Sequence, residues 1–159
     1  MPATCSNHTE TGWVITALSA IDLALWDLRG KAAGQPVRRL LGANRERLDA
    51  YASMLGYSIK PAEASKVARE FLDQGFKRQK WFFASGPSDG VEGLKQNIEL
   101  ARALREKLGA DAILMFDGIQ YVWKSADVDY AIALAKGILP CKPHWLEEPL
   151  RPDDLEGYK

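Results

Sequence analysis

The sequence has few of the residues that cross-link small domains or bind metals through sulfur. Among its 159 residues there are only two cysteines, Cys5 and Cys141, and two histidines. The cysteines are far apart, so they lack the short spacing of thiolate metal sites, and two are too few for a disulfide framework. We therefore expect two reduced thiols in a cytoplasmic protein.

An excess of one charge and long apolar runs are also lacking. Lys and Arg together number 21, as do Asp and Glu, so the formal net charge is zero. Without a basic excess the chain offers no surface suited to a phosphate backbone, which argues against nucleic acid as a partner. No stretch approaches the roughly 20 apolar residues of a membrane span, and the N-terminus lacks a signal-peptide core, so we expect no membrane association. The composition, 47% hydrophobic and 26% charged, is typical of a soluble globular protein.

The first third of the chain is predicted to be helical after a polar tail. Residues 1–12 are small and polar and are expected to form a disordered tail. Residues 13–45 form the predicted helical segment, in which apolar residues recur at helical spacing between 18 and 28. A short second helix is expected at 37–41, between a proline and a glycine.

Residues 46–159 alternate between predicted strands and helices. Strands are expected at 48–55, 77–83, 112–116 and 144–146, and helices at 61–74, 91–108, 128–136 and from 152 onward. This alternation predicts an α/β fold of about four βα units with a parallel sheet. The units could belong to a doubly wound sheet or to a partial (β/α) barrel, because a complete barrel takes about 250 residues.

Three charged residues stand where predicted strands end. Lys80, Asp117 and Glu147 are separated by about one βα unit each, so neighbouring parallel strands should bring them to one rim of the sheet. Two carboxylates there would suit Mg²⁺, which prefers oxygen ligands. Lys80 would offset surplus negative charge, or act on substrate if its pKa were lowered. The alternative is a salt-bridged rim that only stabilises the sheet.

Several motifs resemble those of one enzyme family in the same order along the chain. They are SAIDLALWDLRGKAAGQP at 19–36 with LLG at 40–42, AYAS at 50–53, GFKRQK at 75–80, LMFD at 114–117 and WLEEP at 145–149. Together they resemble the enolase superfamily, in its mandelate racemase/muconate lactonizing enzyme type. This resemblance covers nearly everything from residue 13 to the end.

The resemblance implies a capping domain followed by a (β/α)7β barrel with Mg²⁺ bound at its mouth. Residues 46–159 would then be the first half of that barrel, and 13–45 the segment leading into it. Asp117 and Glu147 match metal ligands, with Glu147 preferred over its neighbour Glu148. Lys80 matches the first lysine of a Lys-x-Lys motif and is the catalytic candidate.

Two departures from the family pattern concern positions that we assign to substrate contact. Phe82 stands where the second lysine would be, and Ile119 stands where many members have an asparagine. These departures favour a sugar-acid dehydratase, a hydro-lyase, with a sugar acid as its small-molecule substrate. A racemase, epimerase or cycloisomerase of the same superfamily remains the alternative.

The resemblance also implies that much of such an enzyme lies outside this chain. We expect the capping domain, the third metal ligand, the catalytic base and acid, and the second half of the barrel to be absent. A half-barrel would leave open strand edges, so we expect homo-oligomers. A catalytically inactive truncated half-barrel is the alternative from a different functional class.

Overall fold

The computed structural model describes residues 10–119 and 127–159 of the chain. It divides into two compact units, residues 1–49 and 50–159, which are described separately. The expected tail lies outside the described residues except for 10–12, which are already helical. The boundary between the units falls after residue 49, four residues later than the expected boundary after residue 45.

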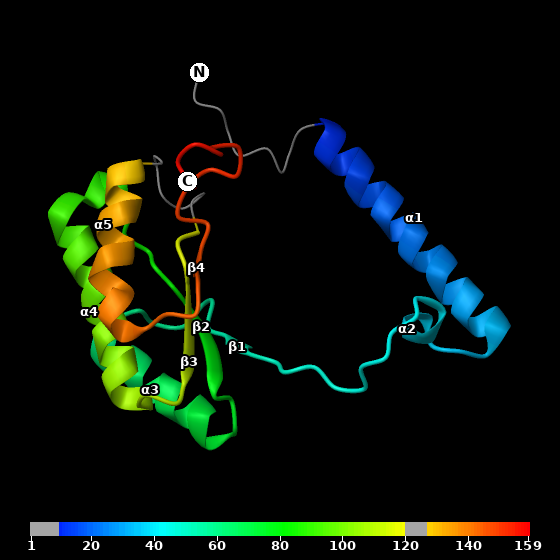
Figure 1. Cartoon of the computed structure of the whole chain (residues 1–159), viewed down its shortest axis with the longest axis horizontal. Coiled ribbons are helices and arrows are strands. Elements are labelled where there is room, and N and C mark those ends of the chain that lie inside the picture. The colour runs from blue at the N-terminus through cyan, green and yellow to red at the C-terminus, as the bar shows by residue number, and fades with distance from the viewer. Residues whose placement is uncertain (1–9, 120–126) are drawn as a thin grey trace. The chain divides into compact units, whose positions relative to one another are not determined.

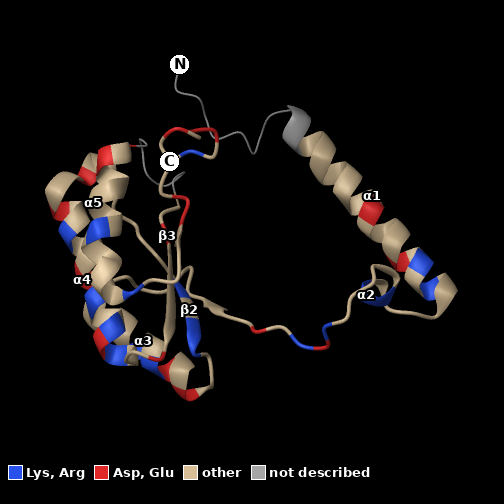
Figure 2. Cartoon of the chain, in the orientation of Figure 1, with Lys and Arg blue, Asp and Glu red and all other residues tan. Residues whose placement is uncertain are grey.

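The first unit consists of two helices, α1 (Glu10–Ala33) and α2 (Val37–Leu40). Helix α1 runs through Gly30, where an added Cβ would lie 2.9 Å from the Gln35 carbonyl oxygen, so only glycine lets the chain turn back this closely. It ends before Gly34, whose φ of +61° favours glycine. Figure 2 shows long uncharged stretches on α1, and apolar side chains such as Leu23 are exposed within this unit. Among the described helices, none has both the length and the apolar character needed to span a membrane.

The second unit is a four-stranded parallel sheet covered by helices. Its strands are β1 (Ala52–Ser53), β2 (Arg78–Phe82), β3 (Ile113–Asp117) and β4 (Leu146–Glu147). Its helices are α3 (Pro61–Asp73), α4 (Gly90–Leu108) and α5 (Val128–Ile138), with 3-10 turns η2 (Pro87–Asp89) and η3 (Leu139–Cys141). Figure 1 shows the three helices together on one side of the sheet.

The strand order decides between the two architectures that the alternation allowed. The strands lie in the order β1-β2-β3-β4, each hydrogen-bonded to its neighbour in sequence. A doubly wound sheet reverses its strand order at a switch point, whereas a barrel adds each strand beside the last. These four strands therefore have the arrangement of a partial barrel, as predicted.

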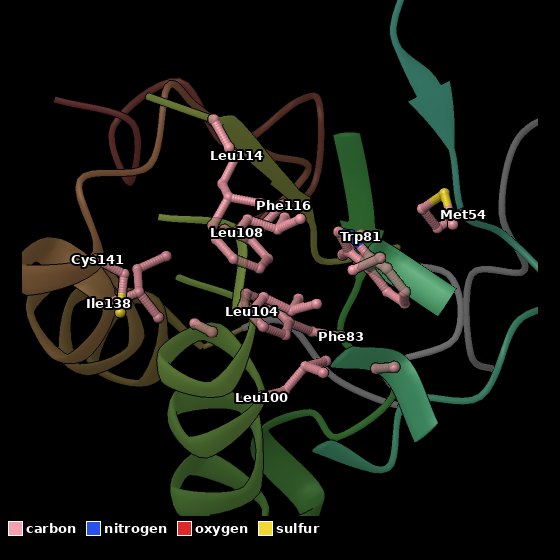
Figure 3. Packing of buried hydrophobic residues seen from close by; sticks show 14 of the residues in the cluster. Met54, Trp81, Phe83, Leu100, Leu104, Leu108, Leu114, Phe116, Ile138 and Cys141 are labelled. Carbon is pink, nitrogen blue, oxygen red and sulfur yellow. The ribbon is translucent and has the colours of Figure 1, made fainter. Parts of the chain in front are cut away.

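The core lies between the sheet and the helices. Alternate residues of β2 and β3, among them Trp81, Leu114 and Phe116, are fully buried and pack against Leu100 and Leu104 of α4 (Figure 3). Burying a large apolar side chain contributes about 1.5–3 kcal/mol, so this face fixes the helices to the sheet. Because side chains alternate along a strand, the residues between them point to the opposite face.

One polar side chain, Gln79 of β2, is also fully buried in this layer. Its amide nitrogen donates to the carbonyl oxygens of Ala68 and Phe76 at 2.9 and 3.2 Å. Its carbonyl accepts the Trp81 indole N–H at 3.1 Å. Since its amide both donates and accepts, Gln79 connects β2 to α3 without leaving an uncompensated polar group.

Three expected elements differ from the structure, and for one, the strand expected at 144–146, only the bounds differ, since β4 is Leu146–Glu147. The strand expected at 48–55 is reduced to the two residues of β1, because it pairs only with β2 and has no second neighbour. The helix expected from residue 152 is wrong, since the described chain forms turns there. Local hydrogen bonds compete with the helix: Gly157 N–H donates to Asp154 Oδ1 at 3.0 Å, and the Tyr158 hydroxyl donates to the Leu150 carbonyl at 2.9 Å.

Candidate active site

The sheet register places Asp117 and Glu147 at the carboxyl ends of β3 and β4, and Lys80 two residues before the end of β2. Asp117 pairs with Phe82 on one side and with Glu147 on the other. Lys80 lies two positions earlier on β2, opposite Met115. Two residues of strand span about 6.6 Å, and the four-carbon stem of lysine covers that distance along the strand.

The side chains of these residues meet at the Lys80 ammonium. Its Nζ lies 2.9 Å from Asp117 Oδ2 and 3.0 Å from Glu147 Oε2. The side chains of Lys80 and Asp117 are 10% and 8% exposed, and that of Glu147 is 39% exposed. We call Lys80, Asp117 and Glu147 the charged cluster.

The two carboxylates of the cluster favour the protonated form of Lys80. Burial by itself lowers the pKa of Lys80, but hydrogen bonds and the charges of Asp117 and Glu147 outweigh burial and raise this pKa above its ordinary value. The sequence left open whether Lys80 offsets charge or acts with a lowered pKa. The direction of the shift favours the role in which Lys80 offsets negative charge.

Backbone geometry orients the Asp117 carboxylate. Its Oδ1 accepts the Ile119 N–H at 2.9 Å, while Oδ2 accepts from Lys80. Ile119 is buried and has a φ of +43°, a left-handed conformation that is rare for a β-branched residue. Ile119 is thus placed at the site, and its backbone N–H supplies its contact to the cluster.

The second carboxylate is held by an aromatic neighbour. Trp145 donates its indole N–H to Glu147 Oε2 at 3.2 Å, and the Gly118 N–H donates to the Glu147 carbonyl at 2.8 Å. The next residue, Glu148, is exposed with a φ of +47°, so the chain turns sharply after β4. The side chain in contact with Lys80 is therefore that of Glu147, and not that of Glu148.

Aromatic rings surround the ammonium. The Lys80 Nζ lies 5.3 Å from the Phe82 ring centroid and 5.9 Å from that of Tyr51. Tyr51 in turn contacts Trp145 edge-to-face, with ring centroids 6.0 Å apart. Ring faces attract a cation and also exclude water, which strengthens the charge interactions of the cluster.

A hydrogen-bond network behind the loop after β2 was not foreseen from the sequence. The Asn97 side-chain N–H donates to the Ser85 carbonyl at 2.8 Å and to the Tyr130 hydroxyl at 3.1 Å. The Tyr130 hydroxyl donates to the same Ser85 carbonyl at 3.1 Å. In the sequence, Asn97 is a polar residue within the apolar stripe of α4. That position could have indicated a buried hydrogen-bonding role for Asn97.

The same loop is shaped by a tight turn. The 86–90 segment contains η2, and the Gly86 N–H donates to Asp89 Oδ2 at 2.8 Å. Gly93 permits close packing here, because an added Cβ would lie 2.6 Å from the Asp89 Cβ. His144 is exposed, and its ring lies 5.3 Å from that of Trp145.

The cluster fits part of a magnesium site. Asp117 Oδ2 and Glu147 Oε2 converge on one cation, the ammonium, and hard carboxylate oxygens are the ligands that Mg²⁺ prefers. Within residues 10–119 and 127–159, no group of three or more acidic, histidine or cysteine side chains gathers around a common point. The remaining positions of a six-oxygen shell would be filled by water or by ligands outside these residues.

Two family models match the chain. Residues 63–159 match the enolase C-terminal domain-like family, and residues 4–42 match the N-terminal domain of mandelate racemase/muconate lactonizing enzymes. The second match refines the expectation that the capping domain is absent, since the helical segment itself matches part of that domain.

Named relatives agree with these matches. The chain is 43% identical over 152 residues to an L-rhamnonate dehydratase of Saccharopolyspora erythraea. It resembles the crystal structure of L-rhamnonate dehydratase from Gibberella zeae, with a TM-score of 0.67 and 41% identity over 87% of the chain. It also resembles a racemase from Streptomyces coelicolor with bound magnesium, with a TM-score of 0.74 and 38% identity over 89% of the chain.

These relatives are much longer than the chain. The chain covers 35% of the Saccharopolyspora protein, 32% of the Gibberella structure and 37% of the Streptomyces structure. It therefore spans about a third of their length.

Proposed function

Because the chain belongs to the mandelate racemase/muconate lactonizing enzyme family of enolase-like proteins, we propose that it is part of a Mg²⁺-dependent hydro-lyase that dehydrates a sugar acid. The observation that carries this proposal is the meeting of Lys80, Asp117 and Glu147 at one end of a partial barrel. The identity of 43% with an L-rhamnonate dehydratase supports the reaction class.

The proposed reaction removes water from a 2,3-dihydroxy acid. A base takes the proton next to the carboxylate, the 3-hydroxyl leaves as water with a proton from a general acid, and the resulting enol tautomerises to a 2-keto acid. Asp117 and Glu147 would hold the magnesium ion. When bound, this ion supplies positive charge where the substrate carboxylate gains negative charge.

The residues of this chain would bind and orient the substrate. Lys80 pairs with both carboxylates, so its proposed role is electrostatic contact with the acid, and the base would be another residue. Phe82 cannot accept a proton, and its ring beside the ammonium would form an apolar wall against the substrate. The Ile119 N–H would keep the Asp117 carboxylate in a fixed orientation.

A racemase is the second candidate function. The 38% identity with a racemase that carries bound magnesium favours it, since proton removal next to a carboxylate is common to both reactions. Phe82 argues against a racemase that uses a lysine at this position as its base. Since the chain spans about a third of its relatives' length, a catalytically inactive chain is the further alternative, and we expect no turnover from it alone.

A chimera tests the proposal. Residues 1–159 replace the matching segment of the Saccharopolyspora dehydratase, and keto-acid formation is measured on a panel of sugar acids that includes L-rhamnonate. We expect Mg²⁺-dependent turnover that falls at least about 100-fold in the Asp117→Asn chimera, because a ligand of the ion is lost. The exposed Lys95→Met change is the matched control and should leave turnover unaltered.

The outcomes separate the candidates. Racemisation without keto-acid formation would favour the racemase. A folded chimera that acts on none of the acids, or an Asp117→Asn chimera with undiminished turnover, would refute the assignment of this site.

A further inference from the structure

The Lys80 ammonium is a cation that Asp117 and Glu147 share. One oxygen of each carboxylate lies close to the same nitrogen, at 2.9 and 3.0 Å. We infer that Lys80 is a built-in counter-ion, which a divalent cation displaces when it binds these two oxygens, and that this displacement frees the ammonium to bind an anionic substrate. The inference rests on the proposed function, because it assumes that these carboxylates hold the metal.

The two carboxylate oxygens that converge are the ones that Lys80 contacts. Asp117 Oδ1 accepts the Ile119 N–H at 2.9 Å, and Oδ2 is the oxygen through which Asp117 shares the ammonium with Glu147. Glu147 Oε2 accepts from both Lys80 and the Trp145 indole. An ammonium and a divalent ion on these oxygens would repel each other strongly in a site where Lys80 and Asp117 are almost fully buried.

The ammonium already lies beside two aromatic rings. The rings of Phe82 and Tyr51 lie 5.3 and 5.9 Å from its nitrogen, within the range of cation–π attraction. The flexible lysine stem allows the ammonium to move along these rings without moving β2. After the exchange, one positive charge faces the mouth of the site beside the metal, which suits a carboxylate-bearing substrate.

Metal affinity measures the competition directly. Mg²⁺ and Mn²⁺ are titrated calorimetrically into the chimera described above, in which the relative supplies the rest of the barrel, and into its Lys80→Met variant and the exposed-site control Lys95→Met. Removing the competing charge should tighten binding at least about tenfold in Lys80→Met, while Lys95→Met should match the unaltered chimera. Equal or weaker binding by Lys80→Met, when the unaltered chimera binds, overturns the inference and leaves the proposed function standing. If none of the three folded proteins binds either ion, the proposed metal site fails, and the inference fails with it.

A second measurement needs no substitution at Lys80 and so does not depend on that variant folding. The unaltered chimera is acylated with an amine-specific reagent, and the modification of each lysine is measured by mass spectrometry with and without saturating Mg²⁺. Displacement should increase the labelling of Lys80 several-fold and leave that of Lys95 unaltered. In Asp117→Asn, Lys80 should label readily even without metal. Unaltered Lys80 labelling at saturating Mg²⁺ would overturn the inference.

Discussion

The network of Asn97, Tyr130 and Ser85 provides the sharpest test of how the fold holds the rim of the site. It joins α4 and α5 to the loop that follows Lys80's strand through three hydrogen bonds of 2.8, 3.1 and 3.1 Å. Tyr130→Phe removes two of these bonds, and Asn97→Ala also removes two. The Asn97–Tyr130 bond is lost in both variants, so it is counted twice when their effects are added.

The magnitudes follow from this overlap. A net hydrogen bond contributes about 0.5–1.5 kcal/mol, and the Ser85 carbonyl keeps one partner in either single variant, so we expect about 1 kcal/mol for Tyr130→Phe. Asn97→Ala should cost about 2 kcal/mol, because buried packing is lost as well. Ser85 is only half-buried, so water can replace its partners in the double variant. The double variant should therefore fall short of the sum by about 0.5–1 kcal/mol.

Urea unfolding followed by tryptophan fluorescence measures these values. Tyr158→Phe combined with Asn97→Ala is the control, since the Tyr158 hydroxyl bonds elsewhere, to Leu150, and the two effects should add. Strict additivity of Asn97→Ala and Tyr130→Phe would show that the network does not act as one unit.

Tyr130 should also make the free energy of unfolding depend on pH. Burial raises the pKa of Tyr130 above its ordinary value of 10.0, and the charge of Asp89 adds to this, although the Asn97 hydrogen bond opposes it. The folded state then keeps the proton longer than the unfolded state, so this contribution to stability is complete below pH 10.0 and is lost as pH rises through the raised value. Tyr130→Phe should remove that part of the alkaline loss, and an unaltered alkaline profile would contradict the assignment.

Three further outcomes can be checked on the isolated chain. Cys141 is buried, and burial raises the pKa of its thiol although the charges of Arg102 and Arg105 oppose this. In a Cys5→Ser background, a thiol reagent should therefore modify Cys141 only as the chain unfolds. Rapid labelling of the native chain would contradict this. Glu148 is exposed and has a φ of +47°, a conformation that glycine adopts more easily than other residues. Glu148→Gly should therefore raise the free energy of unfolding by up to about 1 kcal/mol, while Glu148→Ala should not. Equal effects of the two substitutions would exclude backbone strain as the cause. Strands β1 and β4 are the edges of the sheet, so light scattering should find self-association, and a monodisperse monomer would refute this.

Much of the fold could be predicted from sequence because its elements are long and periodic. Helix α4 and strand β3 lie within one residue of their expected bounds, since an amphipathic stripe and a wholly apolar run each have one stable arrangement here. The spacing of Lys80, Asp117 and Glu147 also sufficed to predict a common rim, because strands in sequential parallel order bring equivalent ends together. The helix expected from residue 152 failed because short polar side chains there bond to nearby backbone, which periodicity does not register.

The amino-acid sequence by itself determined the layered α/β arrangement and which three charged residues approach one another, since both depend on local periodicity and on spacing along the chain. Only the tertiary structure decided that Asp117 and Glu147 raise the pKa of Lys80, that the Ile119 backbone orients Asp117, and that Asn97 and Tyr130 hold the loop after β2. These properties depend on distances of about 3 Å between residues far apart in sequence, where burial and nearby charge set the energies. Such distances are set by packing, and no pattern along the chain specifies them.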